Sequence, residues 1–172
     1  MIKQIVFATL LAFATAGISQ AADAPTDAQI AHVAYTAGVI DINAAHEALK
    51  KSTNVEVVGF AQEMARDHQA VNDQALALVK KLGVTPEDNP ISQSLNKGAT
   101  AELATLDKLD GAAFDKAYID NEVAYHQAVN TALKDTLIPS AQNPELKALL
   151  QSGLTLFTEH EKHAEMLAKD MK

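Results

Sequence analysis

The chain of 172 residues contains no cysteine and no tryptophan, and only 5% of its residues are aromatic. Without cysteine it cannot form disulfides, thiolate zinc sites or cysteine-ligated iron–sulfur clusters, and it has no thiol nucleophile. Basic charge is also scarce, with 14 basic against 22 acidic residues and a net charge of −8, which argues against nucleic acid as a partner. The six histidines and the carboxylates are therefore the groups that could carry chemistry.

Long hydrophobic runs are missing too, apart from one near the start of the chain. Lys3 precedes an apolar stretch over residues 5–18, and the small residues Ser19 and Ala21 follow it. This order is typical of a secretory signal peptide, and a stretch of about 14 residues is shorter than the roughly 20 that a transmembrane helix needs. We therefore expect cleavage of residues 1–21, with an uncleaved anchor helix as the alternative. Residues 22–172 should form one domain, periplasmic or secreted, with no transmembrane helix.

Strand signals are scarce in residues 22–172, which show no sustained apolar–polar alternation and no Asn-Gly hairpins. Caps and breakers, such as the Thr26/Gln29 capping box and Pro144 after Asn143, mark helix ends instead. The pattern predicts four long helices, over residues 27–52, 55–82, 111–137 and 144–171. A short helix is expected at residues 100–109, in a longer central connection. We predict an all-α, up-down-up-down four-helix bundle.

Each predicted long helix carries an ionisable side chain in the middle of its apolar stripe. In chain order these side chains are Asp41, His68, Glu122 together with His126, and His160. Counted along their helices at 1.5 Å per residue, the positions lie at similar heights, with a scatter of roughly 4.5 Å. We therefore expect these five side chains to meet in one buried cluster.

Burying two carboxylates and three imidazoles is costly unless a partner pairs them. A divalent transition-metal ion would do so, because imidazole and carboxylate together suit Fe, Mn, Zn or Cu, whereas Mg and Ca prefer an all-oxygen shell. The alternative is a metal-free hydrogen-bonded network. We favour one bound metal ion, since three buried histidines at one level exceed what packing requires. His163 shares a helix face with His160 and is a candidate extra ligand.

Three segments resemble a family of secreted bacterial proteins catalogued as domain of unknown function 4142. They are residues 60–68 (FAQEMARDH), 114–126 and 154–160. The resemblance implies export and a ferritin-like four-helix fold, and it brings no assigned function. The family pattern usually has Glu where this chain has Asp41, and the shorter carboxylate could loosen or move a metal.

Ferritin-like di-iron sites use Glu-x-x-His pairs on two helices and a further Glu on each of the other two. In this chain, the residues three positions before the three candidate histidines are Ala65, Val123 and Phe157. Neither Glu-x-x-His pair is present. We therefore expect a mononuclear site with three histidines and one or two carboxylates.

The leading interpretation is a periplasmic ferritin-like protein that binds one transition-metal ion for buffering, storage or stress protection. A first alternative is a small metal-dependent redox enzyme, which would need an access channel to an open coordination position. A second is a metal-free envelope interaction module that uses the acidic surface or a loop over residues 85–100. The sequence indicates no protein partner, and it is compatible with a homo-oligomer.

Overall fold

The computed structural model describes residues 24–171, so the predicted signal peptide lies outside the described part. The regular elements between these limits are all helical, which confirms the all-α part of the predicted fold. They are α1 (Asp27–Lys51), α2 (Val55–Leu82), α3 (Pro90–Leu106), α4 (Gly111–Ala132), α5 (Ile138–Ser140) and α6 (Pro144–Asp170). A π-helical turn, Leu133–Leu137, joins α4 to α5.

Local chemistry explains where these helices begin and end. Thr26 and Gln29 each accept a hydrogen bond from the other's backbone N–H, which completes the predicted capping box of α1. Asn143 caps α6 by accepting from two N–H groups of its first turn, and Pro144 stands at the first helical position. Gly83 ends α2 with a φ of 65°, a left-handed conformation that favours glycine.

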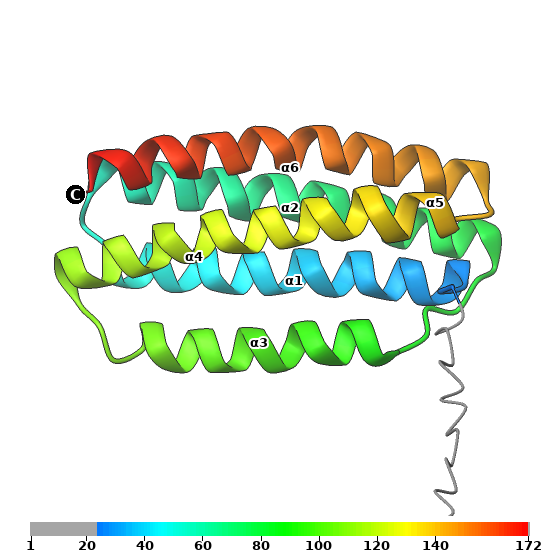
Figure 1. Cartoon of the computed structure of the whole chain (residues 1–172), viewed down its shortest axis with the longest axis horizontal. Coiled ribbons are helices and arrows are strands. Elements are labelled where there is room, and N and C mark those ends of the chain that lie inside the picture. The colour runs from blue at the N-terminus through cyan, green and yellow to red at the C-terminus, as the bar shows by residue number, and fades with distance from the viewer. Residues whose placement is uncertain (1–23, 172) are drawn as a thin grey trace, which may run out of the picture.

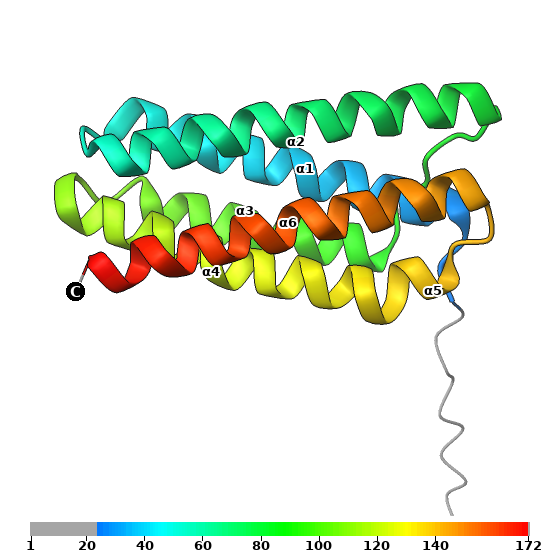
Figure 2. The same ribbon diagram turned by 90° about the horizontal axis from the view of Figure 1, so that it is seen from above.

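The four longest helices, α1, α2, α4 and α6, lie lengthwise beside one another, and α3 packs outside them against α1 and α4 (Figures 1 and 2). Each of the four contacts two neighbours that run in the opposite direction. Thus α1 packs between α2 and α4, and α6 packs between the same two helices.

The central connection differs from the prediction. Helix α3 has 17 residues instead of the expected short helix at residues 100–109, and it carries the chain back to the end of the molecule where α1 finishes (Figure 1). There, Lys51 Nζ donates to the backbone oxygens of Leu106 and Asp107 at 3.1 and 2.8 Å. Helices α2 and α4 therefore run in the same direction, and the predicted up-down-up-down order is wrong.

The physical reason for the longer α3 lies at its start. The Asn89 side chain accepts from the backbone N–H groups of Ile91 and Ser92, and Pro90 occupies the first helical position. This cap starts a helix within the segment expected to be a loop at residues 85–100. Most of that loop, which the interaction-module hypothesis used, is therefore helix.

Pro139 does not end the third long helix near Leu137 as predicted. Proline lacks an N–H donor and crowds the carbonyl four residues before it, which disturbs regular α-helical bonding. Here the chain widens into the π-helical turn before Pro139 and continues helically to Ser140.

The core has an apolar cluster towards each end of the long helices. One contains Phe60, Met64 and Tyr118, and the other contains Ile30 and Phe157. On every long helix the predicted site residues fall in sequence between members of the two clusters. The site therefore lies at mid-height of the molecule.

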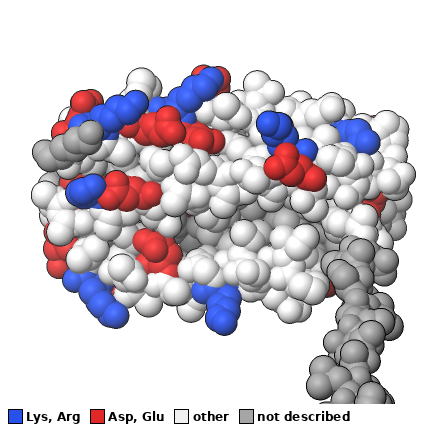
Figure 3. All heavy atoms as spheres, in the orientation of Figure 1, with Lys and Arg blue, Asp and Glu red and all other residues white. Residues whose placement is uncertain are grey.

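No helix in the described part is both long and apolar enough to cross a bilayer. On the face shown in Figure 3, acidic and basic side chains are intermixed and much of the surface carries neither. That face therefore offers no large patch of a single charge sign.

Candidate metal centre

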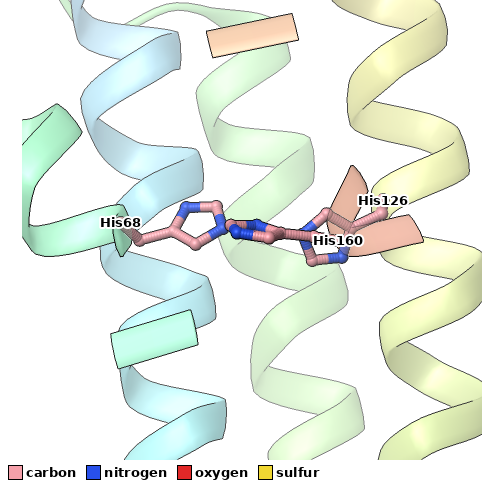
Figure 4. Close-up of side chains that lie close together, drawn as sticks. All are labelled: His68, His126 and His160. Carbon is pink, nitrogen blue, oxygen red and sulfur yellow. The ribbon is translucent and has the colours of Figure 1, made fainter. Parts of the chain in front are cut away.

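The structure brings together the five side chains predicted to form the site. They are Asp41 on α1, His68 on α2, Glu122 and His126 on α4, and His160 on α6, each only 1–2% exposed. Figure 4 shows the three imidazoles pointing towards one another from α2, α4 and α6. The ring centroids form a nearly equilateral triangle with sides of 5.4, 5.5 and 5.6 Å.

Donor atoms from these residues form two overlapping groups. One ring nitrogen from each of His68, His126 and His160 lies within 4.8 Å of the others. Donor atoms of Asp41, Glu122 and His126 lie equally close together. Because His126 belongs to both groups, the three imidazoles and two carboxyls surround a common region.

The distances from the Asp41 carboxylate to two of the histidines match the distance between two ligands of one metal ion. The Asp41 Oδ2 atom lies 3.4 Å from His68 Nε2 and 3.6 Å from His126 Nε2. These separations are long for hydrogen bonds. Two ligands held at about 2.0–2.1 Å in a tetrahedral shell are about 3.3–3.4 Å apart. The geometry thus suits two ligands of one ion better than a directly bonded pair.

Polar atoms of these five residues are buried without hydrogen-bond partners. The unpaired atoms are Asp41 Oδ1 and Oδ2, His68 Nδ1 and Nε2, Glu122 Oε2, His126 Nε2 and His160 Nδ1. Leaving a buried polar group unpaired costs about 1–3 kcal/mol. Asp41 and Glu122 can share a proton between their carboxyls, but the unpaired histidine nitrogens have no such partner, so the donor set fits a cation better than a metal-free network.

Burial also sets the protonation of the cluster. It raises the pKa of Asp41 to about 7, an effect that a hydrogen bond from the Glu122 carboxyl partly opposes. Burial, followed by the charge of Asp41, raises the pKa of Glu122 well above 4.5. Burial lowers the pKa of His126 to about 4 and that of His68 well below 6.5. At neutral pH the imidazoles are therefore neutral, which is the form that binds metals.

Two of the histidines are oriented by a second contact. His126 Nδ1 donates to the Glu122 carbonyl oxygen at 3.0 Å, which leaves Nε2 as the atom with the free lone pair. His160 Nε2 lies 3.2 Å from Asp67 Oδ2, and Asp67 Oδ1 accepts from Arg66 Nε at 2.7 Å. A carboxylate that holds the other ring nitrogen of a histidine is common support for a metal ligand.

The structure places His163 apart from the central cluster. Its Nδ1 lies 2.8 Å from Glu63 Oε2, its ring meets Phe60 edge-on at 5.2 Å, and 39% of its side chain is exposed. The sequence analysis predicted no site role for Glu63 or Asp67. Both lie outside the apolar stripe of α2, and no nearby sequence pattern indicates that they contact histidines of α6.

Phe157 occupies the position where a Glu-x-x-His motif ending at His160 would place its glutamate. The Phe157 ring stacks on His68 with centroids 4.5 Å apart and planes 5° from parallel. It also lines an apolar cavity of about 90 Å³. An aromatic wall therefore stands where a di-iron site would need a carboxylate.

Comparisons with known proteins show the family and the fold of the chain. A model of the family described as "domain of unknown function (DUF4142)" matches residues 12–167. No curated protein matches the chain. A solved structure described as "CopM in the Cu(II)-bound form" matches with a TM-score of 0.66 and 14% identity, covering 87% of this chain and 99% of that one. At this identity the likeness shows the fold alone.

Proposed function

The chain belongs to the DUF4142 family, and we propose that it is an exported, ferritin-like protein that binds one transition-metal ion in its core. The proposed ligands are Asp41, His68, His126 and His160. Glu122 lies beside them as a further carboxylate that can bind the ion or balance its charge. The observation that carries the proposal is the set of unpaired buried donor atoms around this centre.

The donor set favours a borderline divalent ion. Three imidazoles and one or two carboxylates suit Fe, Mn, Zn or Cu, and they are poor ligands for Mg or Ca. Copper is the first ion to test, because the neighbour CopM was solved with Cu(II). Phe157 stacks on His68 at the position where a two-metal site would need a carboxylate, which supports a single ion per chain.

We propose a role in metal buffering, storage or stress protection in the periplasm, following removal of residues 1–21. Turnover is not part of the proposal. Four protein ligands would complete a tetrahedral shell, and a redox enzyme needs an open coordination position that a substrate can reach. Each proposed ligand is almost fully buried.

The test is metal binding by the untagged chain from residue 22 onward. After removal of metal with a chelator, the protein is titrated with Cu(II), Zn(II), Mn(II) or Fe(II), and bound metal is counted by mass spectrometry. We expect one tightly bound ion per chain, lost in His126→Ala and in the near-isosteric Asp41→Asn. His46→Ala removes an exposed histidine of α1 and should retain the ion.

The proposal fails if the wild type retains no stoichiometric ion and none of these metals changes its melting temperature. It also fails if His46→Ala loses as much metal as His126→Ala. Circular dichroism of each variant separates the loss of a ligand from the loss of the fold.

A further inference from the structure

A second group of potential metal ligands lies on the solvent side of His160. Glu63 and Asp67 stand one turn apart on α2, and they face His160 and His163 on α6. Donor atoms of Glu63, Asp67 and His160 lie within 4.8 Å of one another. His163 joins the group through its 2.8 Å contact with Glu63. Two carboxylates and two imidazoles are a ligand set for a borderline divalent cation.

This outer group extends from solvent to the core. The side chains of His163 and Glu63 are 39% and 33% exposed, that of Asp67 is 18% exposed, and that of His160 is 1% exposed. A hydrated ion can therefore reach Glu63 and His163 directly, whereas the central cluster is closed to solvent.

His160 belongs to both donor groups. Its Nε2 contacts Asp67 in the outer group, and its Nδ1 is buried without a hydrogen-bond partner. Its ring also lies 5.4–5.5 Å from those of His68 and His126. One imidazole therefore connects the exposed donors to the buried ones.

We propose that Glu63, Asp67, His160 and His163 form an outer loading site, from which a divalent transition-metal ion passes into the core through His160. This inference rests on the proposed function. While Nε2 holds the ion outside, the ring proton is on Nδ1. Transfer inward breaks the Nε2–metal bond and forms the Nδ1–metal bond. The Nδ1 proton leaves to a core carboxylate, and Nε2 takes up a proton from water on the Asp67 side. The ring therefore stays neutral, and no redox step is involved.

Two features should make this outer site bind a metal ion more weakly than the core site does. Arg66 Nε lies 2.7 Å from Asp67 Oδ1 and places a positive charge beside the ion. Solvent exposure of Glu63 and His163 weakens their attraction for a cation. A weak outer site beside a strong inner one holds the ion briefly, as loading requires.

The test follows the loading rate with Cu(II) alone as the probe. Metal-free protein is mixed with Cu(II) in a stopped-flow instrument and the absorbance of the bound ion is recorded. Release to excess chelator is measured in the same way. For Glu63→Gln/His163→Gln we expect loading and release to slow by the same factor, about tenfold or more, because an acidic entry site raises the local cation concentration. Equilibrium affinity and stoichiometry should not change.

The matched control is Glu159→Gln, which removes an equal charge from an exposed α6 residue paired with Lys162. It should load at the wild-type rate. Wild-type rates in the double variant, or equal slowing in the control, overturn the loading site while the proposed function stands. Absence of a core ion in the wild type overturns both, and the stoichiometry measured first distinguishes the two failures.

Discussion

Asp41 is an acidic side chain buried among apolar residues and neutral imidazoles. Its pKa of about 7 in the folded metal-free protein compares with an ordinary value of 3.8. Between these values the folded state keeps a proton that the unfolded state releases, so stability falls as pH rises. We expect metal-free Asp41→Asn to be about 2–4 kcal/mol more stable than the wild type at pH 8, with the difference vanishing below about pH 4.

Urea denaturation in the presence of EDTA, repeated across this pH range, measures the difference. The buried histidines contribute with the opposite sign, because their lowered pKa values cost stability as pH falls below about 6.5. They are present in both proteins, so the comparison isolates Asp41. A difference that does not depend on pH would show that folding leaves the pKa of Asp41 unchanged.

Asp67 should act on the ion through His160. Its contact with Nε2 fixes the imidazole proton and ring orientation, and loss of such support typically costs 10–100-fold in metal affinity. We expect Asp67→Asn to weaken core binding about 10–100-fold in a chelator competition, with unchanged stoichiometry. Asp73→Asn alters an exposed α2 carboxylate that pairs with Gln69 and lies away from His160, and this variant should bind normally. Equal affinities in the two variants would exclude this role for Asp67.

Sequence spacing located Asp41, His68 and His126 because each interrupts an apolar stripe, and a stripe faces the core wherever its helix packs. Counting residues along each predicted helix then placed these three side chains at similar heights in the bundle. Glu63 and Asp67 lie off the stripe, and their role depends on how α2 and α6 are rotated towards each other. That rotation arises from packing over the whole helix pair, which local spacing does not encode.

At the scale of elements, α1 and α2 approach closely at Gly38. A Cβ atom there would lie 2.3 Å from Asn72 Oδ1, so a larger residue must push the Asn72 side chain aside. We expect Gly38→Ala to destabilise the wild type by about 1–2 kcal/mol, since overpacking outweighs the gain in helix propensity.

In an Asn72→Ala background the obstruction is gone, and Gly38→Ala should stabilise the protein by about 0.5–1 kcal/mol. A double-mutant cycle by urea denaturation measures this change of sign. Equal effects in the two backgrounds would show that Asn72 does not oppose a side chain at position 38.

Helix ends were predictable where a side chain signals them locally, as at Thr26 and Asn143. The length of α3 was not, because this helix packs outside the four long helices and Ser92 and Leu106 are its only buried residues. The direction of α4 depends on that length. A longer α3 returns the chain to the opposite end of the molecule before α4 begins, and it therefore changes the topology.

At the scale of the whole molecule, the proposed ion joins two helical hairpins. Asp41 and His68 come from α1 and α2, whereas His126 and His160 come from α4 and α6. Binding to the folded state alone should stabilise the protein by about 2.7 kcal/mol at a free metal concentration 100 times the Kd. We expect the melting temperature to rise by about 5–10 °C.

Scanning calorimetry with Cu(II) buffered at that ratio tests this stabilisation. His126→Ala should show little or no shift under the same conditions. A rise of equal size in that variant would indicate binding elsewhere on the chain.

The antiparallel packing of the four long helices has a consequence at the centre of the molecule. Two of these helices begin and two finish at each end, so their macrodipoles largely cancel along the axis. The charge of a bound ion must then be balanced locally by the two carboxylates, which match a divalent ion when both are ionised. One-electron reduction to a monovalent ion would leave one negative charge in excess. Uptake of one proton by either carboxylate would remove this excess, so the redox state of the ion would be coupled to pH.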